Sequence, residues 1–273
     1  MDKQTQAALF LARTPVHRLL RRLHHKLDRY MEIAENWNNG DETTNGEAWL
    51  IGCVGRHLRV AFDVGANVGR WTLLLHQGNP ECVVYAFEPS PQTFASLQKQ
   101  VEKLVSVRPF QLGLADRATT LSFHDYGPDS VLSSFISREK SVDLKPQRDI
   151  QVPVSTIDAF RSEHSLDAID FIKIDTEGYE MAVLRGAADS LRKRRIAMIQ
   201  FEYGGTWLDA RESLAEANDL LKQHGYELYR LRQQSLTKII YDSRRHECFK
   251  YSNFVAVCSP DILRRWQVPV SKE

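Results

Sequence analysis

Short apolar runs in this chain of 273 residues repeatedly end in an acidic residue, and carboxylates at strand ends can bind polar ligands or accept protons. Runs of this length, rich in Val, Ile and Phe and closed by turn residues, are typical of β-strands. The acids that follow them are Asp63, Glu88, Asp116, Asp175 and Glu202. Because the carboxyl ends of parallel strands meet at one edge of an open α/β sheet, we expect these acids to line one crevice.

Helix capping is the competing explanation for each acid taken singly, because Asp is a common N-cap residue. Glu is a poorer cap, and Glu202 is followed by Tyr203, Gly204 and Gly205 rather than by a helical pattern. The sequence therefore favours a shared site over a set of separate caps.

The segment DVGANVG predicts a tight turn between a strand and a helix. Gly65, Ala66, Asn67 and Gly69 keep this turn small, so that the backbone and the positive end of the helix can approach a ligand. Asp63 would repel a pyrophosphate, but it suits the ammonium group of a methionine moiety. A turn or N-cap role is the alternative for Asp63.

Glu88 ends the next apolar run, and Pro89 closes it. This is the place of the carboxylate that accepts hydrogen bonds from ribose hydroxyls in a doubly wound fold. Together with the turn, it points to S-adenosylmethionine. Leu114 and Asp116 follow the third run and are expected to line the same cofactor site. A nicotinamide-dependent reductase would share the fold class, but the G-x-G-x-x-G fingerprint and a Tyr-x-x-x-Lys pair are missing.

These motifs resemble the FkbM-type methyltransferases. The resemblance rests on DVGANVG, AFEPSP, the Ser-Ser of VLSSF, FIKIDTEGYEMAVLRGA and IQFEY, and it covers residues 63–231. It implies a class I methyltransferase fold, which is Rossmann-like, with a doubly wound, mostly parallel seven-stranded sheet and an antiparallel C-terminal hairpin. It also implies O-methylation of a sugar, glycoconjugate or natural-product hydroxyl, with S-adenosyl-L-homocysteine as the product. In this pattern Asp175 looks like the acid nearest the methyl group.

Methyl transfer from a sulfonium centre is an in-line displacement, in which the protein mainly positions the acceptor. The acceptor hydroxyl must lose its proton, so a carboxylate within hydrogen-bond reach is the natural base. Asp175, Glu202 and Glu177 are our candidates for catalysis. These three could also hold Mg²⁺ through oxygen ligands, although we predict no metal. Their structural alternative is to stabilise the start of the following helix.

Ser133 and Ser134 lie in a long polar segment, residues 127–149, between two predicted strands, and such insertions often act as lids. With Tyr203 they are expected to contact the substrate. A cofactor-binding scaffold without catalysis remains a competing interpretation of the whole pattern. Substitution of the candidate acids by amides separates the two interpretations, because a scaffold would keep its partner function.

The N-terminal part carries a separate pattern. We predict a helical extension over residues 1–58, a methyltransferase domain over 59–260 and a C-terminal tail over 261–273. Apolar residues recur at helical spacing opposite a basic face. The apolar residues are Val16, Leu19, Leu20, Leu23, Leu27, Tyr30 and Met31. Packing on the core or pairing of two chains into a homodimer is the simpler prediction, and a membrane surface or anionic partner is the alternative.

Composition excludes some classes of function. The formal net charge is +1, so no overall field attracts nucleic acid. The segment IDTEG also lacks the D-P-P-Y-like element that holds a flipped base. The chain starts without a secretory pattern, and none of its apolar runs is long enough to span a bilayer. We therefore expect a cytoplasmic enzyme acting on a small-molecule or glycan hydroxyl.

Overall fold

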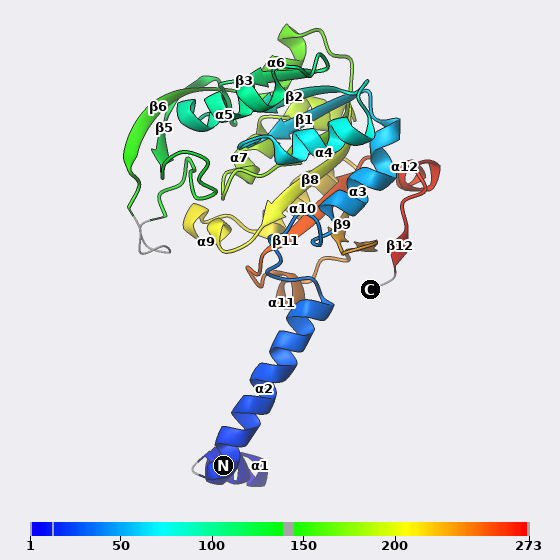
Figure 1. Ribbon diagram of the computed structural model, residues 1–273. Helices are drawn as coiled ribbons and strands as arrows, with labels where there is room; N and C mark the ends of the chain where they lie inside the picture. The colour runs from blue at the N-terminus through cyan, green and yellow to red at the C-terminus, as the bar shows by residue number, and fades with distance from the viewer. Residues whose placement is uncertain (1, 13, 139–144, 272–273) are drawn as a thin grey trace.

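A mostly parallel β-sheet forms the centre of the protein in the computed structural model, which describes residues 2–12, 14–138 and 145–271 (Figure 1). Within those residues the sheet has nine strands: β1 (Val60–Val64), β2 (Val83–Phe87), β3 (Val107–Phe110), β7 (Ile169–Ile174), β8 (Ile196–Tyr203), β9 (Glu227–Leu231), β10 (Leu236–Lys238), β11 (Ser252–Val257) and β12 (Val270–Ser271). Their order is β12-β10-β9-β11-β8-β7-β1-β2-β3. The run β3-β2-β1-β7-β8 is parallel, and β11 pairs antiparallel with both β8 and β9.

This topology confirms the predicted α/β class, with its parallel sheet and its antiparallel C-terminal strands. The predicted count of seven strands is too low, because β10 and β12 extend the edge beyond β9. These two strands have three and two residues, which is too short for an alternating pattern to show in the sequence. The second of them lies in the segment predicted as a tail.

Two layers of helices cover the sheet, because the central strands are apolar on both faces. Phe62 of β1 points to one core and its neighbour Ala61 to the other. The first face packs against α6 (Ile157–Glu163), α7 (Glu180–Arg185), α8 (Ala188–Arg192) and α10 (Leu214–Gln223). The second packs against α3 (Glu47–Val54), α4 (Arg70–Gly78), α5 (Pro91–Val101) and α12 (Pro260–Arg265). Two further short helices are α9 (Thr206–Ala210) and α11 (Ser243–His246).

A second sheet stands beside the first and has the order β4-β6-β5, with β4 (Gly113–Leu114), β5 (Thr119–Asp125) and β6 (Arg148–Ser155). The antiparallel pair β5 and β6 was predicted, and its register joins Thr119 to Val154. Between them lies a segment that we call the flap, residues 126–138. Part of the predicted lid, residues 139–144, is outside the described residues.

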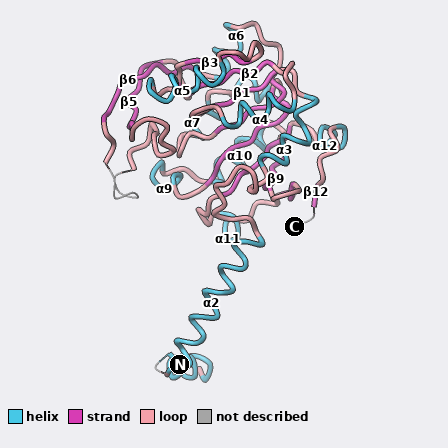
Figure 2. Tube along the Cα trace, in the orientation of Figure 1, coloured by secondary structure: helices cyan, strands magenta, loops and turns pink. Residues whose placement is uncertain are grey.

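Two further helices precede α3 in the chain: α1 (Lys3–Ala12) and α2 (Pro15–Ala34). The helix α2 extends away from the body of the protein, with the N-terminus at its far end (Figures 1 and 2). None of its residues is buried, so the expectation that it packs on the core is wrong. In the described part of the chain, every helix is too short or too polar to cross a membrane.

Candidate functional site

A cavity of about 850 Å³ opens at the carboxyl ends of β1, β2, β7 and β8. Its volume lies within the range of roughly 300–1,000 Å³ that is typical of small-molecule sites. The walls come from the turn after β1, the ends of β2 and β8, the segment after β7 and the flap. Residues 40–47, before and at the start of α3, and Tyr251, just before β11, complete them. The predicted crevice at this edge of the sheet therefore exists.

The turn after β1 is held against β2 by its own backbone. The amides of Gly65 and Ala66 donate to the carbonyl of Phe87 at 3.0 and 2.9 Å. Gly65 has a φ of +80°, and a Cβ on it would lie 1.8 Å from the carbonyl oxygen of Asp175, so only glycine fits. Gly65, Ala66 and Asn67 line the cavity, whereas Gly69 caps α4 and contacts α5 instead.

Glu88 lies where the ribose-binding carboxylate was predicted. Its two oxygens accept hydrogen bonds from the backbone amides of Asn67 (3.0 Å) and Ser90 (2.8 Å). Burial raises the pKa of Glu88 to about 7, against the lowering effect of these two amides. Glu88 and Pro89 both line the cavity, so the carboxylate keeps access to a ligand.

Asp63 is placed differently from the expectation of direct contact. It is fully buried behind the turn, is absent from the cavity lining, and accepts a hydrogen bond from the Thr72 hydroxyl at 2.7 Å. Its second oxygen has no hydrogen-bond partner among the described residues. Burial raises the pKa of Asp63 to about 6, and Lys173 opposes that rise. Asp63 therefore supports the site from below the turn.

Asp116 is also outside the cavity. The apolar run before it does not form one strand, because the chain leaves β3 at Phe110 and enters the second sheet at Gly113. Leu114, at the end of β4, lines the cavity, while Asp116 is exposed in the following bend. Of the five strand-end acids, Glu88, Asp175 and Glu202 line the crevice.

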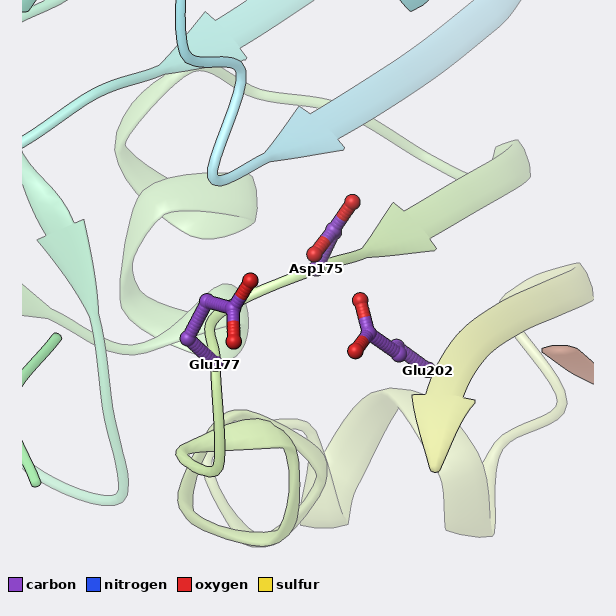
Figure 3. Close-up of side chains that lie close together, drawn as sticks. All are labelled: Asp175, Glu177 and Glu202. Atoms are coloured by element: carbon purple, nitrogen blue, oxygen red, sulfur yellow. The ribbon is translucent and has the colours of Figure 1, made fainter. Parts of the chain in front are cut away.

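The three candidate catalytic acids come together. One carboxylate oxygen of each of Asp175, Glu177 and Glu202 lies within 4.8 Å of the others. Figure 3 shows Asp175 just after β7, Glu177 in the following loop and Glu202 on β8, with the three side chains turned toward a common space. We call these residues the acid cluster.

Asp175 is the ionised member of the acid cluster. Burial opposes its ionisation, but the Lys173 ammonium, 2.7 Å from Oδ2, brings its pKa below the usual value. Glu202 is only 6% exposed, and burial with the adjacent Asp175 raises its pKa well above the usual value. Burial and the charge of Asp175 therefore favour the protonated form of Glu202, which can donate a hydrogen bond to Asp175.

Glu177 also favours its protonated form. Burial and the charge of Asp175 raise its pKa to about 8, although Arg138 lies 3.0 Å from its Oε2 and opposes the rise. Three carboxylates could hold a divalent cation. Lys173 lies 2.7 Å from Asp175 and Arg138 lies 3.0 Å from Glu177, so two of the three carboxylates already face a cation of the chain.

Helix capping does not explain Asp175. The helix α7 starts at Glu180, and its N-cap Tyr179 makes no side-chain cap. Glu180 is almost fully buried and accepts hydrogen bonds from the amides of Thr176 and Gly178 at 2.9 and 3.1 Å. Glu180 therefore shapes the loop, which leaves Asp175 directed into the cavity.

The three predicted substrate contacts have different positions. Ser133 lines the cavity, and its hydroxyl accepts from the amide of Tyr126. Ser134 is buried and donates to the carbonyl of Glu177 at 2.8 Å, which ties the flap to the loop after β7. Tyr203 faces away from the cavity, with its hydroxyl against Glu247 and Phe249.

The lining residues that sequence reasoning missed include Glu47, Lys173 and Tyr251. Glu47, at the start of α3, accepts from the side-chain amides of Asn45 (2.9 Å) and Asn253 (3.0 Å), and burial raises its pKa. Lys173 could have been found, because it is two residues before Asp175 on a strand and so shares its face. Nothing local marks Glu47 or Tyr251.

The residues of the cavity fit S-adenosylmethionine by the chemistry of their groups. Glu88 offers a carboxylate for ribose hydroxyls, and Asp175 offers negative charge near a sulfonium. Phe87, Leu112 and Leu114 supply apolar side chains that an adenine ring could pack against.

Comparisons with known proteins also indicate a methyltransferase. The chain is 33% identical to methyltransferase 1 of Beauveria bassiana over 143 residues, which cover 46% of this chain and 57% of that protein. It is 29% identical to the 31-O-demethyl-FK506 methyltransferase FkbM of Streptomyces tacrolimicus, over 61% of this chain and 72% of that one. It is 25% identical to the hexuronic acid methyltransferase AglP of Haloferax volcanii, over 58% and 62%.

The chain thus spans about three fifths of the length of two of these relatives. A family match adds to them, because residues 63–228, more than half of the chain, match the methyltransferase FkbM domain. This match confirms the predicted family and its cofactor, S-adenosylmethionine. The chain belongs to the FkbM methyltransferase family.

Proposed function

We propose that the protein is an S-adenosylmethionine-dependent O-methyltransferase that acts on a hydroxyl of a sugar, glycoconjugate or natural product. The observation that carries this proposal is the acid cluster, in which Asp175, 2.7 Å from the Lys173 ammonium, lies beside the buried Glu202 in a cavity that Glu88 also lines. The names of two relatives support the acceptor class, since one refers to a 31-O-demethyl compound and the other to a hexuronic acid.

The cofactor supplies an electrophilic methyl group, and the protein supplies position and a proton acceptor. Glu88 holds the ribose, and the turn at Gly65 gives the backbone room to approach the rest of the cofactor. Asp175 accepts the hydroxyl proton as the new carbon–oxygen bond forms. Lys173 keeps Asp175 ionised before that step, and Glu202 steadies its charge through the hydrogen bond that it donates.

The test is a methyl-transfer assay with isotopically labelled S-adenosylmethionine and a panel of neutral sugars, hexuronic acids and polyketide alcohols. Mass spectrometry of the acceptors should show the addition of one labelled methyl group. The variant Asp175→Asn should reduce the rate about 10²-fold to 10⁴-fold, because it lacks the base, while binding of S-adenosylhomocysteine is retained.

Three outcomes would count against the proposal. A transfer rate unaffected by Asp175→Asn would remove Asp175 from catalysis. A chain that binds the cofactor but methylates none of the acceptors, and whose partner interactions survive Asp175→Asn and Glu202→Gln, would be a cofactor-binding scaffold. Oxidation of added NADPH with a carbonyl substrate would instead indicate a reductase.

A further inference from the structure

The helix α2 exposes an apolar stripe to solvent. Leu19 is 57% exposed, Leu27 63% and Tyr30 67%, and no residue of the helix is buried. The other members of the stripe are Val16, Leu20, Leu23 and Met31. Most of the stability of a helix in a protein comes from the packing of its apolar face, and a large exposed apolar patch usually marks an interaction site. The stripe is therefore expected to bind a partner.

The polar face of α2 is basic. Five side chains carry positive charge, Arg18, Arg21, Arg22, Lys26 and Arg29, against two acids, Asp28 and Glu32. The whole chain has a net charge of only +1, so positive charge is concentrated on this helix. An apolar face bordered by Arg and Lys is typical of helices that lie in the interface of an anionic bilayer.

A second copy of the chain fits the helix less well. In a paired α2, basic side chains of both copies would border the seam with few acids to neutralise them. The stripe is also wider than a two-stranded seam, because Leu19 and Met31 flank the positions at 16, 20, 23, 27 and 30 that repeat every three or four residues. Charge and width both favour a flat, anionic and apolar partner.

The end of α2 is fixed to the body of the protein. Arg230 and Arg232 form ion pairs with Glu35, and Lys250 lies 3.2 Å from Glu32. The guanidinium of Arg230 also stacks on Trp37, 4.6 Å from the ring centre. Since β9 and β11 flank these contacts, a surface that binds α2 would hold the whole domain in a defined orientation.

We propose that α2 docks the protein on an anionic phospholipid surface, with its apolar stripe inserted among the acyl chains and its basic residues among the headgroups. The helix then lies on the membrane and does not cross it, in agreement with its many charges. This inference is independent of the reaction in the cavity.

The experiment is co-sedimentation of the full chain with vesicles of phosphatidylcholine, with and without phosphatidylglycerol. The chain should bind the vesicles that contain phosphatidylglycerol, and added salt should weaken binding. Leu23→Ser with Leu27→Ser should weaken it about a hundredfold, since two leucines that insert into the bilayer are lost. Arg22→Gln with Lys26→Gln should weaken it about thirtyfold.

Matched controls change the same residue types elsewhere. Ile240→Ser alters an apolar side chain that is 79% exposed, and Lys103→Gln with Arg117→Gln removes two exposed charges from the body. These variants should bind vesicles like the unaltered chain. All variants should keep the stabilisation by S-adenosylhomocysteine, which shows that they are folded.

Three results would overturn the proposal. One is the absence of vesicle binding. Another is binding that is equally strong with and without phosphatidylglycerol, or that neither double variant of the helix weakens. The third is a chain that sediments as a dimer, becomes a monomer with Leu23→Ser and Leu27→Ser, and leaves vesicles unbound. That result would assign the stripe to a second copy.

Discussion

The cavity has two walls that differ in how the sequence encodes them. The turn wall consists of Gly65, Ala66, Asn67 and Glu88, and it is made by two adjacent strand ends of the parallel sheet. The composite wall consists of Glu42, Glu47, Glu202 and Tyr251, which come from the N-terminal extension, β8 and the segment before β11. The acid cluster member Asp175 lies where the two walls meet, since its carbonyl faces Gly65.

The two walls also differ in their position relative to the residues that match the family. The turn wall lies within the matched family residues, 63–228, and under the proposed function it binds the cofactor. Three of the four residues of the composite wall, all except Glu202, lie outside that match. Under the proposed function, the composite wall is where the acceptor is selected.

The sharpest way to break the turn wall is Gly65→Ala. The added Cβ would lie 1.8 Å from the Asp175 carbonyl oxygen, and the φ of +80° disfavours any side chain. We expect a loss of about 3 kcal/mol in the free energy of unfolding, measured by denaturant titration. The control is Gly52→Ala in α3, where a Cβ meets nothing within 4 Å, and it should be neutral or slightly stabilising. Equal stability of both variants would contradict the described turn.

The next effect concerns binding at the turn wall. Glu88→Ala removes the carboxylate expected to accept two ribose hydroxyls, so the Kd of S-adenosylhomocysteine should rise about thirtyfold or more. Glu88→Gln, which keeps the shape, should lose less. Calorimetric titration measures both. A Kd within threefold of the unaltered chain for Glu88→Ala would remove the ribose role.

A pH effect of intermediate size should arise from Glu180, which shapes the loop between the walls. Burial raises its pKa to about 7 from an ordinary 4.5, so the folded state holds a proton that the unfolded state releases. Its contribution to stability is therefore complete below about pH 4.5 and is lost as the pH rises through about 7, by on the order of 1 kcal/mol for each pH unit. Chemical unfolding of Glu180→Gln and the unaltered chain between these values should show a flatter slope for the variant. Identical slopes would contradict it.

The smallest effect should come from the composite wall. Glu47→Gln keeps the side-chain shape and the acceptor for Asn253 while it removes an ionisable group. We expect the Kd of S-adenosylhomocysteine to stay unchanged and the KM of the acceptor to change about threefold to tenfold, because one hydrogen bond is altered. Steady-state kinetics with the identified acceptor distinguishes the two. A change in the Kd of S-adenosylhomocysteine without a change in the KM of the acceptor would contradict the assignment of Glu47 to acceptor binding.

Local patterns were sufficient to predict the turn wall. The order of small residues after β1 and the acid after β2 are encoded within a few residues, and the parallel sheet brings them together. The same reasoning failed for Asp116, because the chain changes sheets between Phe110 and Gly113 without a turn signal that stands out. It also placed Asp63 in the cavity, whereas burial and Thr72 hold that residue beneath the turn.

The composite wall could not be predicted for a different reason. Glu47 is close to Tyr251 only because α3 packs against the sheet and β11 is inserted between β8 and β9. Contacts between residues about 200 positions apart, such as Glu47 with Asn253, leave no periodic pattern in one sequence. The helix α2 was predicted from its period, but its lack of contact with the core depends on the finished fold.

The most direct measurement of the division between the walls is calorimetric titration of S-adenosylhomocysteine into the unaltered chain, Glu88→Ala and Glu47→Gln under one set of conditions. We predict tight binding to the unaltered chain, at least about thirtyfold weaker binding to Glu88→Ala, and binding to Glu47→Gln within about threefold. Equal losses in the two variants, or no binding to the unaltered chain, would contradict the assignment of the turn wall to the cofactor.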